Sequence, residues 1–554
     1  MTTSAPRQQP ARTSRRPARP GGDTPHERAA SAAAFVRRYR WLILLGLITA
    51  AIMEVLDTTI VNVALPQMAG NLGATQEEIG WVATGYILSN VIFLPMTAFF
   101  AARFGRQRYL TVSIAMFVIA SFFCGTSHSL VELVLWRIVQ GAGGAALLST
   151  AQATLRQIFT REEQAVVQSV FMLGIIVAPT LGPTLGGWIT DNYTWNWCFF
   201  INVPIGIASM FLISTFLHDS PDLQAKRGTV DWTGIGLLTV GVGGLQYVLE
   251  EGNSKDWFSD NTILRLAILS GACLITMVWW ELSKRNKHPV VDFHVLHNRT
   301  LSASIFLFIT LGFGLYGGVF LFPMFAQGIL RMTPTDTGLA MLPGGIATGA
   351  SALLCGWMLN GKKPLMDARV LIACGIGLFS FSMWRMGHLT SAAGEIDVRN
   401  ALLIRGFGLG LLFVPINNVA YASLEPSEAQ QAAGLISLAR QLGGSFGIAV
   451  LANYVSKHAE YHRADLVSDL AVGNLGVAAR LDMLTKGMMA RGMDAYTAHN
   501  AALKILNNQV DVQSSMLSFN DAWVFVLIVF VAVSPAILIL RRPKGHSAMP
   551  AEAH

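Results

Sequence analysis

The sequence places ionisable side chains inside long apolar stretches. Glu54 and Asp57 interrupt one such stretch, and Arg137, Arg405 and Arg440 interrupt three others. An ionised group at the depth of a bilayer is energetically costly, and it indicates a functional site by default. Burial favours the protonated form of a carboxyl group, whereas a nearby cation favours the charged form. A carboxylate whose surroundings change can therefore bind a proton on one side of a membrane and release it on the other, so Glu54 and Asp57 are candidates for proton coupling.

Asp57 and Arg137 are expected at similar depth. They lie about six and five residues from the outer ends of their apolar stretches, or ~9 Å and ~7–8 Å in a helix. Their opposite charges make pairing available, and a fixed ion pair between helices is the alternative to a proton relay. Glu54 precedes Asp57 by three residues, which puts both on one helix face with Glu54 nearer the midplane. For Glu54, a proton or cation site and a structural role both remain open.

Arg405 and Arg440 have no acidic partner at matching depth. We expect them to face a water-filled cavity or an anionic group of a ligand, and a role in packing or topology is the alternative. The other side chains predicted to line this cavity are Trp81, Tyr86, Gln140 and Tyr316. For the aromatic members, packing and contact with lipid are the alternatives.

The composition indicates a membrane protein. Only 13% of the 554 residues are charged, against about 25% in a typical soluble domain, and 52% are hydrophobic. Residues 1–40 carry nine arginines and two acidic residues. Their net charge of +7 equals the net charge of the whole chain. The remainder is neutral and has no basic stripe for nucleic acid. We expect residues 1–40 to form a basic disordered cytoplasmic tail, without the apolar core of a cleavable signal peptide.

Apolar runs of about 20 residues, long enough to cross a bilayer as helices, occur fourteen times. The predicted spans are 41–63, 79–100, 109–127, 132–155, 165–189, 197–217, 231–249, 262–281, 301–327, 337–359, 370–388, 399–422, 433–454 and 521–541. Fourteen basic residues lie in the loops on the same side of the membrane as the N-terminus, and two lie in the short loops on the opposite side. Because positive charge favours the cytoplasm, we expect both termini there, including a tail at 542–554.

Two parts of the chain resemble each other. Residues 62–80 and 319–338 share a Pro, an Ala three positions later, a Thr and a closing Gly, and Arg137 and Arg405 stand in corresponding Gly- and Leu-rich spans. We therefore expect an all-α polytopic fold with an N-terminal six-helix bundle, two inserted helices with a linker, and a C-terminal six-helix bundle, at 41–217, 218–300 and 301–541. Two parallel six-helix halves are typical of a secondary transporter that rocks around a site near the midplane.

One segment between spans, 455–520, is too polar to cross a membrane and long enough to fold into helices outside it. It is expected on the periplasmic side, as a solvated loop or as a docking surface. His458 and His462 have a spacing that can hold a metal ion, but no third ligand is evident. The five cysteines also lack metal-ligand spacing. A polytopic enzyme is therefore disfavoured, and no metal or cofactor is expected.

The segment 174–189 is predicted to form a hinge helix at the face between the two halves. Small residues recur there at every fourth position, namely Gly174, Ala178, Gly182 and Gly186. Such a stripe allows another helix to approach closely. Pro179 and Pro183 remove backbone donors and are expected to bend the helix.

Five motifs resemble the major facilitator superfamily, and specifically its fourteen-span drug:proton antiporters of the EmrB/QacA type. They are LDTTIVNVALP at 56–66, GRQR at 105–108, LVLWRIVQGAGG at 133–144, APTLGPTLGG at 178–187 and FFINVPIG at 199–206. The resemblance is dense in the first half, and in the second half it rests on topology and weaker repeats.

The resemblance implies roles for several of these residues. Asp57 is implied as the acid of coupled transport and Arg137 as the arginine of the proton relay. The implied antiporter hinge consists of Gly182, Pro183, Gly186 and Gly187. The implied cytoplasmic gate consists of Arg103, Gly105 and Arg106, in a motif where Ala98 and Ala102 replace the Gly and Asp that the family expects. The resemblance also implies a bacterial inner-membrane location and a tripartite pump with a periplasmic adaptor and an outer-membrane channel.

Transport driven by a proton gradient is the function that these expectations favour. The chain has no GxxxxGK[ST] loop for a nucleotide, which excludes ATP-driven transport by this chain alone. We expect export of amphipathic drugs or other small toxic compounds across the cytoplasmic membrane in exchange for protons. Dedicated export of one endogenous product, such as a siderophore, a fatty acid or an antibiotic, is the alternative.

Overall fold

The computed structural model consists of helices and loops over the residues that it describes, which are 25–160, 163–218, 231–283, 286, 289–359, 365–391, 393–422, 424, 428–470 and 475–540. The first half contains α1 (Pro25–Leu72), α2 (Gln76–Ile79), α3 (Trp81–Phe93), α4 (Thr97–Phe104), α5 (Arg106–Thr126), α6 (Leu130–Ile158), α7 (Gln164–Asn192), α8 (Trp197–Phe200) and α9 (Asn202–Phe216). The inserted pair is α10 (Trp232–Glu251) and α11 (Asn261–Glu281). The second half contains α12 (Arg299–Gly328), α13 (Pro334–Leu359), α14 (Ala368–Met386), α15 (Glu395–Ala422), α16 (Ala429–Asp469), α17 (Leu475–Met489) and α18 (Ala495–Val533). Short 3₁₀ turns are η2 (Trp257–Ser259), η3 (Phe293–His297) and η4 (Ser534–Ile539).

Most predicted spans fall on one helix, whereas 79–100, 197–217 and 521–541 each fall on consecutive helical segments. Twelve helices in the described part are long and apolar enough to cross a membrane, and α3 and α4 form a further candidate as a pair bent by 59°. The predicted span at 165–189 falls on α7, a helix of 29 residues in which the stretch Val166–Ile175 is apolar. The chain is therefore a multi-pass membrane protein with an all-α fold.

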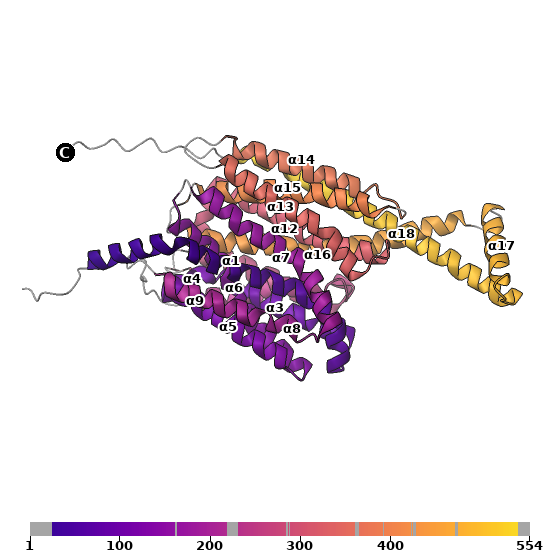
Figure 1. The fold of residues 1–554 in the computed structure, drawn as a ribbon, viewed down its shortest axis with the longest axis horizontal. Helices are drawn as coiled ribbons and strands as arrows, with labels where there is room; N and C mark the ends of the chain where they lie inside the picture. The colour runs from indigo at the N-terminus through magenta and orange to yellow at the C-terminus, as the bar shows by residue number, and fades with distance from the viewer. Residues whose placement is uncertain are drawn as a thin grey trace, which may run out of the picture.

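Corresponding helices of the two halves pack in the same way. In the first half α1 packs against α7 and α9, and α6 lies between α3 and α5. In the second half α12 packs against α16 and α18, and α15 lies between α13 and α14. The halves meet where α7 packs along α13 and where α16 contacts α4 and α6. Figure 1 shows this side-by-side arrangement, with the first half in indigo and purple and the second in orange and yellow.

The inserted helices α10 and α11 pack against each other at the side of the bundle. α10 also contacts α3 of the first half and α16 of the second. One contact to α16 is a hydrogen bond of 2.9 Å from Gln246 Nε2 to Ser445 Oγ. The insertion therefore touches both halves.

The polar segment 455–520 is helical in its described part. α16 and α18 continue out of the bundle as one hairpin, with α17 at its tip (Figure 1). The Arg463 guanidinium joins the two long helices through Asp511 Oδ1 at 2.8 Å and Asn507 Oδ1 at 2.9 Å. His458 stacks on Tyr454, and His462 pairs with Asp521. No group of three metal-ligating side chains occurs among the described residues.

We use "inner end" for the end of the bundle that carries the turn at Gly105, and "outer end" for the end that carries the hairpin. The turn joins α4 to α5, and Gly105 adopts φ 86° there. Residues other than glycine rarely adopt this backbone conformation. Gly105 therefore fixes the reversal of the chain at the inner end.

Candidate functional site

Asp57 and Arg137 form a buried ion pair in the first half. Arg137 Nη1 lies 2.5 Å from Asp57 Oδ2. The Asp57 side chain is 0% exposed and that of Arg137 is 1% exposed. α1 supplies the acid and α6 supplies the base. The pairing expected from matching depth is thus present.

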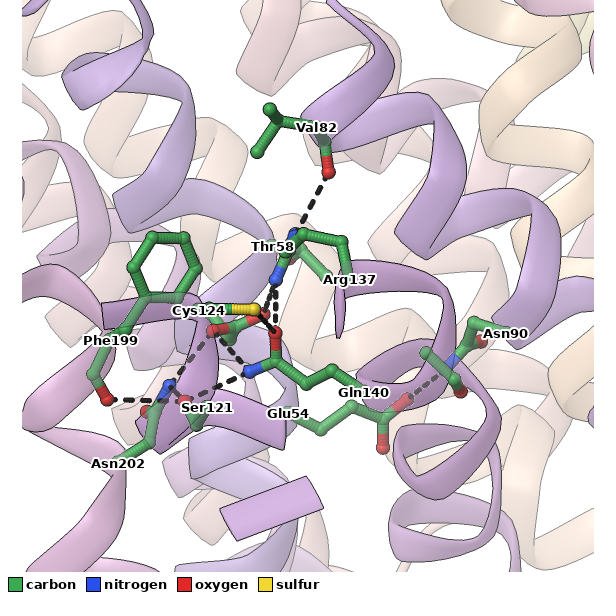
Figure 2. Close-up of polar contacts among 12 residues, drawn as sticks. Glu54, Thr58, Val82, Asn90, Ser121, Cys124, Arg137, Gln140, Phe199 and Asn202 are labelled. Atoms are coloured by element: carbon green, nitrogen blue, oxygen red, sulfur yellow. Dashed lines mark hydrogen bonds and ion pairs between the residues drawn. The ribbon is translucent and has the colours of Figure 1, made fainter. Parts of the chain in front are cut away.

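Further polar side chains complete the hydrogen bonding of this pair (Figure 2). Asp57 Oδ1 accepts hydrogen bonds from Gln140 Nε2 at 3.0 Å and from Asn202 Nδ2 at 2.8 Å. Arg137 also donates to the Gln140 side-chain oxygen at 2.8 Å and to the Val82 carbonyl at 2.9 Å. The pair is therefore held by donors and acceptors from α3, α6 and α9.

Ser121 of α5 connects the same network to the rest of the half. Its hydroxyl accepts from Gln140 at 3.0 Å and from Asn202 at 3.0 Å, and it donates to the Phe199 carbonyl at 3.1 Å. All of these side chains are fully buried. A buried pair with complete hydrogen bonding is costly to break, because either charge alone would be left without compensation.

Glu54, one helical turn away, is held less firmly. Its Oε2 accepts from the Leu148 backbone N–H at 3.0 Å, and its Oε1 receives only a long contact of 3.5 Å from Asn90 Nδ2. Figure 2 shows Glu54 facing Asn90, away from the donors that surround Ser121. The carboxylate also interacts electrostatically with Arg440 of the second half. Glu54 is thus a weakly bonded acid at the boundary between the halves.

Arg440 and Tyr316 meet on the other side of this boundary. Arg440 Nη1 donates to the Tyr316 hydroxyl at 3.2 Å, and its guanidinium lies 5.8 Å from the centre of the Phe413 ring. α16 carries Arg440 and α12 carries Tyr316. Within the described part of the chain, Arg440 has no acidic group within 4 Å, as its sequence depth suggested.

Arg405 lies apart from this pair, in the core of the second half. Its side chain is 7% exposed, and Nη1 has no hydrogen-bond partner in the described structure. It contacts Gly318 of α12, where a Cβ in place of the glycine hydrogen would lie 2.7 Å from Nη1. The arginine of the second half thus packs closely against the α12 backbone at a glycine. Whether Arg405 faces a ligand stays a prediction.

Three other predicted cavity residues lie elsewhere. Trp81 contacts Tyr247 of α10 at the outer end, with ring centres 5.8 Å apart and ring planes tilted by 35°. The Tyr86 ring is 1% exposed and covers the Arg137 guanidinium at 4.2 Å. Gln140 is buried in the Asp57 network. Tyr86 and Gln140 therefore contact the ion pair, and a place for them in the wall of a substrate cavity stays a prediction.

The glycine stripe of α7 faces α1. A Cβ added at Gly174 would lie 2.8 Å from Ile52 Cδ1, and one added at Gly186 would lie 2.8 Å from the Ile60 carbonyl oxygen. Gly182 meets Thr59 even more closely, whereas Gly187 has nothing within 4 Å. α7 also packs along α13 of the second half, so it lies at the predicted interface. It passes Pro183 as one continuous helix; the side chain of Pro179 lies outside the described residues.

Gly186→Ala is expected to lower the free energy of unfolding by about 1–3 kcal/mol, because the new methyl group meets backbone that cannot rotate away. The thermal unfolding midpoint of the purified protein measures this loss. Gly187→Ala is the matched control in the same turn. It should be neutral or slightly stabilising, since alanine has the higher helix propensity and meets open space there. Equal midpoints for the two variants would contradict the close approach of α7 to α1.

The inner end holds two arrangements of arginines. Arg106 of the predicted gate is buried and hydrogen-bonds to Gln157 of α6 in its own half, whereas Arg103 is exposed. The contact that joins the halves comes from Arg156, which donates to the Asn417 carbonyl at 3.2 Å and lies 4.2 Å above the Tyr421 ring. Arg156 is thus a closing contact at this end.

Reasoning from the sequence missed Asn202, Ser121, Asn90 and Arg156. Asn202 stands within the motif FFINVPIG, so an uncharged amide in a predicted span was its only clue. Arg156 counted only as a topological charge. Hydroxyl and amide groups within spans are common, and their partners become visible only when the helices are assembled.

Comparison with known proteins assigns the fold. The model of the Major Facilitator Superfamily matches residues 47–448. The multidrug export protein EmrB of Haemophilus influenzae is 36% identical over 408 residues, which cover 73% of this chain and 78% of that protein. The fatty acid resistance protein FarB of Neisseria gonorrhoeae is 32% identical over 513 residues, covering 92% and 97%. The multidrug export protein EmrB of Escherichia coli K12 is 29% identical over 487 residues, covering 87% and 93%.

A solved structure of the same superfamily has a similar backbone. The proton:xylose symporter XylE, bound to 6-bromo-6-deoxy-D-glucose, aligns with a TM-score of 0.54 and covers 92% of this chain and 97% of its own. Its sequence identity of 13% supports the shared fold alone.

Proposed function

The chain belongs to the major facilitator superfamily, as a permease of the EmrB multidrug efflux type, and from this premise we propose that it exports amphipathic small molecules in exchange for protons. The names of its relatives, two multidrug export proteins and a fatty acid resistance protein, support the export of such compounds. The observation that carries proton exchange is the position of Glu54 between the halves.

Glu54 is the group that carries the proton in this proposal. Its partners Leu148 and Asn90 belong to its own half, whereas Arg440 belongs to the other half. If the halves rock, the distance to Arg440 changes while the other contacts stay. A nearby cation favours the carboxylate and its withdrawal favours the protonated acid. The buried Asp57–Arg137 pair lies one helical turn away on α1.

The proton gradient supplies the energy, and no cofactor is required. One proton moving down 100 mV releases ~2.3 kcal/mol, which supports roughly 50-fold accumulation of a substrate. We place both termini, and the inner end of the bundle, in the bacterial cytoplasm. In this orientation Arg156 closes the cytoplasmic side, and the α16–α18 hairpin stands in the periplasm.

Proteoliposomes with a trapped pH-sensitive dye and an imposed pH gradient test the exchange. We expect addition of a substrate from a panel of lipophilic cations and long-chain weak acids to release protons through the wild-type protein. Protein-free liposomes and a proton ionophore give the lower and upper limits. Substrate uptake that is independent of the pH gradient would contradict antiport.

The hairpin is the proposed docking site for a periplasmic adaptor that leads to an outer-membrane channel. Its tip exposes apolar side chains, with Leu475 87%, Tyr496 79% and Met483 60% exposed. Exposed apolar surface rimmed by polar residues is typical of a protein interface. The tip stands clear of the membrane-spanning bundle, so a change there leaves the transport pathway untouched (Figure 1).

Leu475→Glu combined with Met483→Glu is expected to reduce drug efflux from intact cells about tenfold, a loss of ~1.4 kcal/mol in docking. Proton exchange in proteoliposomes, where no adaptor is present, should stay unchanged. Tyr461→Glu, a comparably exposed residue on the stem of the hairpin, is the control. Unchanged efflux from cells would contradict docking at the tip, and an equal loss in both assays would point to misfolding.

A further inference from the structure

A row of polar side chains on α6 leads from Glu54 to the inner end of the bundle. The row begins where the backbone N–H of Leu148 donates to Glu54. Gln152 and Arg156 follow on α6, each four residues further on. Residues four apart lie on one face of a helix, so this face covers ~12 Å from Leu148 to Arg156.

α15 presents a matching face from the second half, and it runs in the same direction as α6. Phe413 lies 5.8 Å from the Arg440 guanidinium, and Asn417 and Tyr421 follow at intervals of four residues. The Asn417 carbonyl accepts a hydrogen bond from Arg156 at 3.2 Å, and the Tyr421 ring centre lies 4.2 Å from the same guanidinium. The two faces therefore meet at Arg156. We call this row of side chains the α6–α15 path and define it by Gln152, Arg156, Asn417 and Tyr421.

Five side-chain polar atoms of this path have no hydrogen-bond partner in the described structure. They are Gln152 Oε1, Asn417 Nδ2 and Oδ1, the Tyr421 hydroxyl and Arg156 Nε. The Asn417 side chain is 0% exposed and that of Gln152 is 3% exposed. Buried amides and hydroxyls without a protein partner are commonly bridged by water. Hydrogen-bonded water passes protons, so the α6–α15 path is suited to conduct them between Glu54 and the inner end.

Arg156 places a positive charge at the inner end of this path. Its guanidinium contacts a carbonyl and an aromatic ring, and no carboxylate of the described residues pairs with it. Its charge is therefore not neutralised by an ion pair. A positive group at a constriction excludes protons and other cations.

We propose that Arg156 prevents protons from passing between Glu54 and the cytoplasm while the halves are closed at the inner end. The proposal rests on proton exchange at Glu54, and it names the residue that keeps this exchange coupled to transport. When Glu54 is open to the outer side, an unguarded path to the inner end would let protons cross without a substrate. When the halves part at the inner end, Arg156 leaves Asn417 and Tyr421, and the proton of Glu54 is released there.

Proton leak without any substrate tests the barrier, in proteoliposomes with a trapped pH-sensitive dye and an imposed pH gradient. We expect Arg156→Gln to raise the leak at least about tenfold above the wild type, the effect of a barrier lower by ~1.4 kcal/mol. Arg156→Lys keeps the positive charge and should keep the leak low. Arg40→Gln is the matched control, because Arg40 lies beside Phe159 at the same end of α6 and pairs with Glu163. It should not leak.

Asn417→Leu tests the path itself. The change removes a buried amide that has no side-chain partner in the described part of the chain, so the protein should fold normally. Combined with Arg156→Gln, it should return the leak to the wild-type level, because leucine offers water no hydrogen bond.

Three results would overturn the proposal. The first is an Arg156→Gln protein as tight as the wild type. Loosening of the inner closure alone gives this result, because a transporter that rests open at the inner end stays closed at the outer end. The second is an equal leak in Arg156→Gln and Arg156→Lys, which would assign the effect to packing and not to charge. The third is a leak that Asn417→Leu does not reduce, which would place the path elsewhere.

The substrate-driven exchange assay separates this proposal from antiport. Exchange in the wild type together with a tight Arg156→Gln protein would keep antiport and reject the barrier. A leak in Arg156→Gln that Asn417→Leu abolishes, without exchange in the wild type, would reject antiport and keep the barrier.

Discussion

Glu54→Gln is expected to reduce substrate-driven proton exchange to the background of protein-free liposomes, a loss of at least about 100-fold, or ~2.7 kcal/mol. Glutamine keeps the shape and an oxygen for the Leu148 N–H, but it cannot bind and release a proton. The variant should therefore fold normally, with a thermal midpoint within about 3 °C of the wild type. Substrate binding without a gradient should persist.

Glu250→Gln is the matched control for this result. Glu250 is another carboxylate within a helix of the bilayer, in α10, and it accepts a hydrogen bond from Gln246 at 3.0 Å. This donor lies on the same helix, and its amide nitrogen also donates to Ser445 of α16, so Glu250 itself is bonded within the inserted pair. Exchange should survive in Glu250→Gln. Exchange that also survives in Glu54→Gln would move the proton site elsewhere, and Asp57 would then be the first candidate.

The spans and the Asp57–Arg137 contact could be predicted because both depend only on position along the membrane normal. Apolar length sets where a helix crosses, and counting residues from the membrane surface sets the depth of a charge. Two opposite charges at one depth then have few other partners. The same reasoning placed Arg440 without an acidic partner at matching depth, and in the structure Arg440 donates to the Tyr316 hydroxyl.

The direction in which a side chain points around the helix axis could not be predicted in the same way. Tyr86 and Gln140 have polar groups in an apolar span, a property that fits a cavity wall and an ion-pair network equally well. The structure turns both inward, towards Arg137. Trp81 faces the inserted helix α10, whose position beside α3 has no counterpart in the repeat.

Hydropathy also did not predict where α16 ends and where α18 begins. The predicted spans stop at residue 454 and resume at 521, where polar residues begin and end. In the structure α16 continues to Asp469, and α18 starts at Ala495. A helix continues beyond the bilayer when its polar part packs against another segment. Here α16 and α18 pack against each other, and Arg463 forms an ion pair with Asp511 between them. Contacts between two distant segments carry this information, and local composition does not.

Arg137→Met is expected to destabilise the protein by about 3–5 kcal/mol, because it leaves Asp57 charged, fully buried and without its counter-ion. The Val82 carbonyl and the Gln140 side-chain oxygen each lose a donor as well. The loss appears as a lower thermal midpoint and a smaller monodisperse yield. Proton exchange then falls with the folded fraction.

Asp57→Asn combined with Arg137→Met separates the buried charge from the missing contacts. Removing both charges of a buried pair is often nearly neutral, whereas removing one is not. The asparagine still accepts from Gln140 or Asn202, so the double variant should be more stable than Arg137→Met alone. If it regains stability but exchanges no protons, the pair serves coupling through its charge as well as the fold. If it regains both, the pair is structural, and Glu54 alone carries the coupling. A double variant no more stable than Arg137→Met would show that the lost hydrogen bonds, and not the unpaired Asp57, cause the destabilisation.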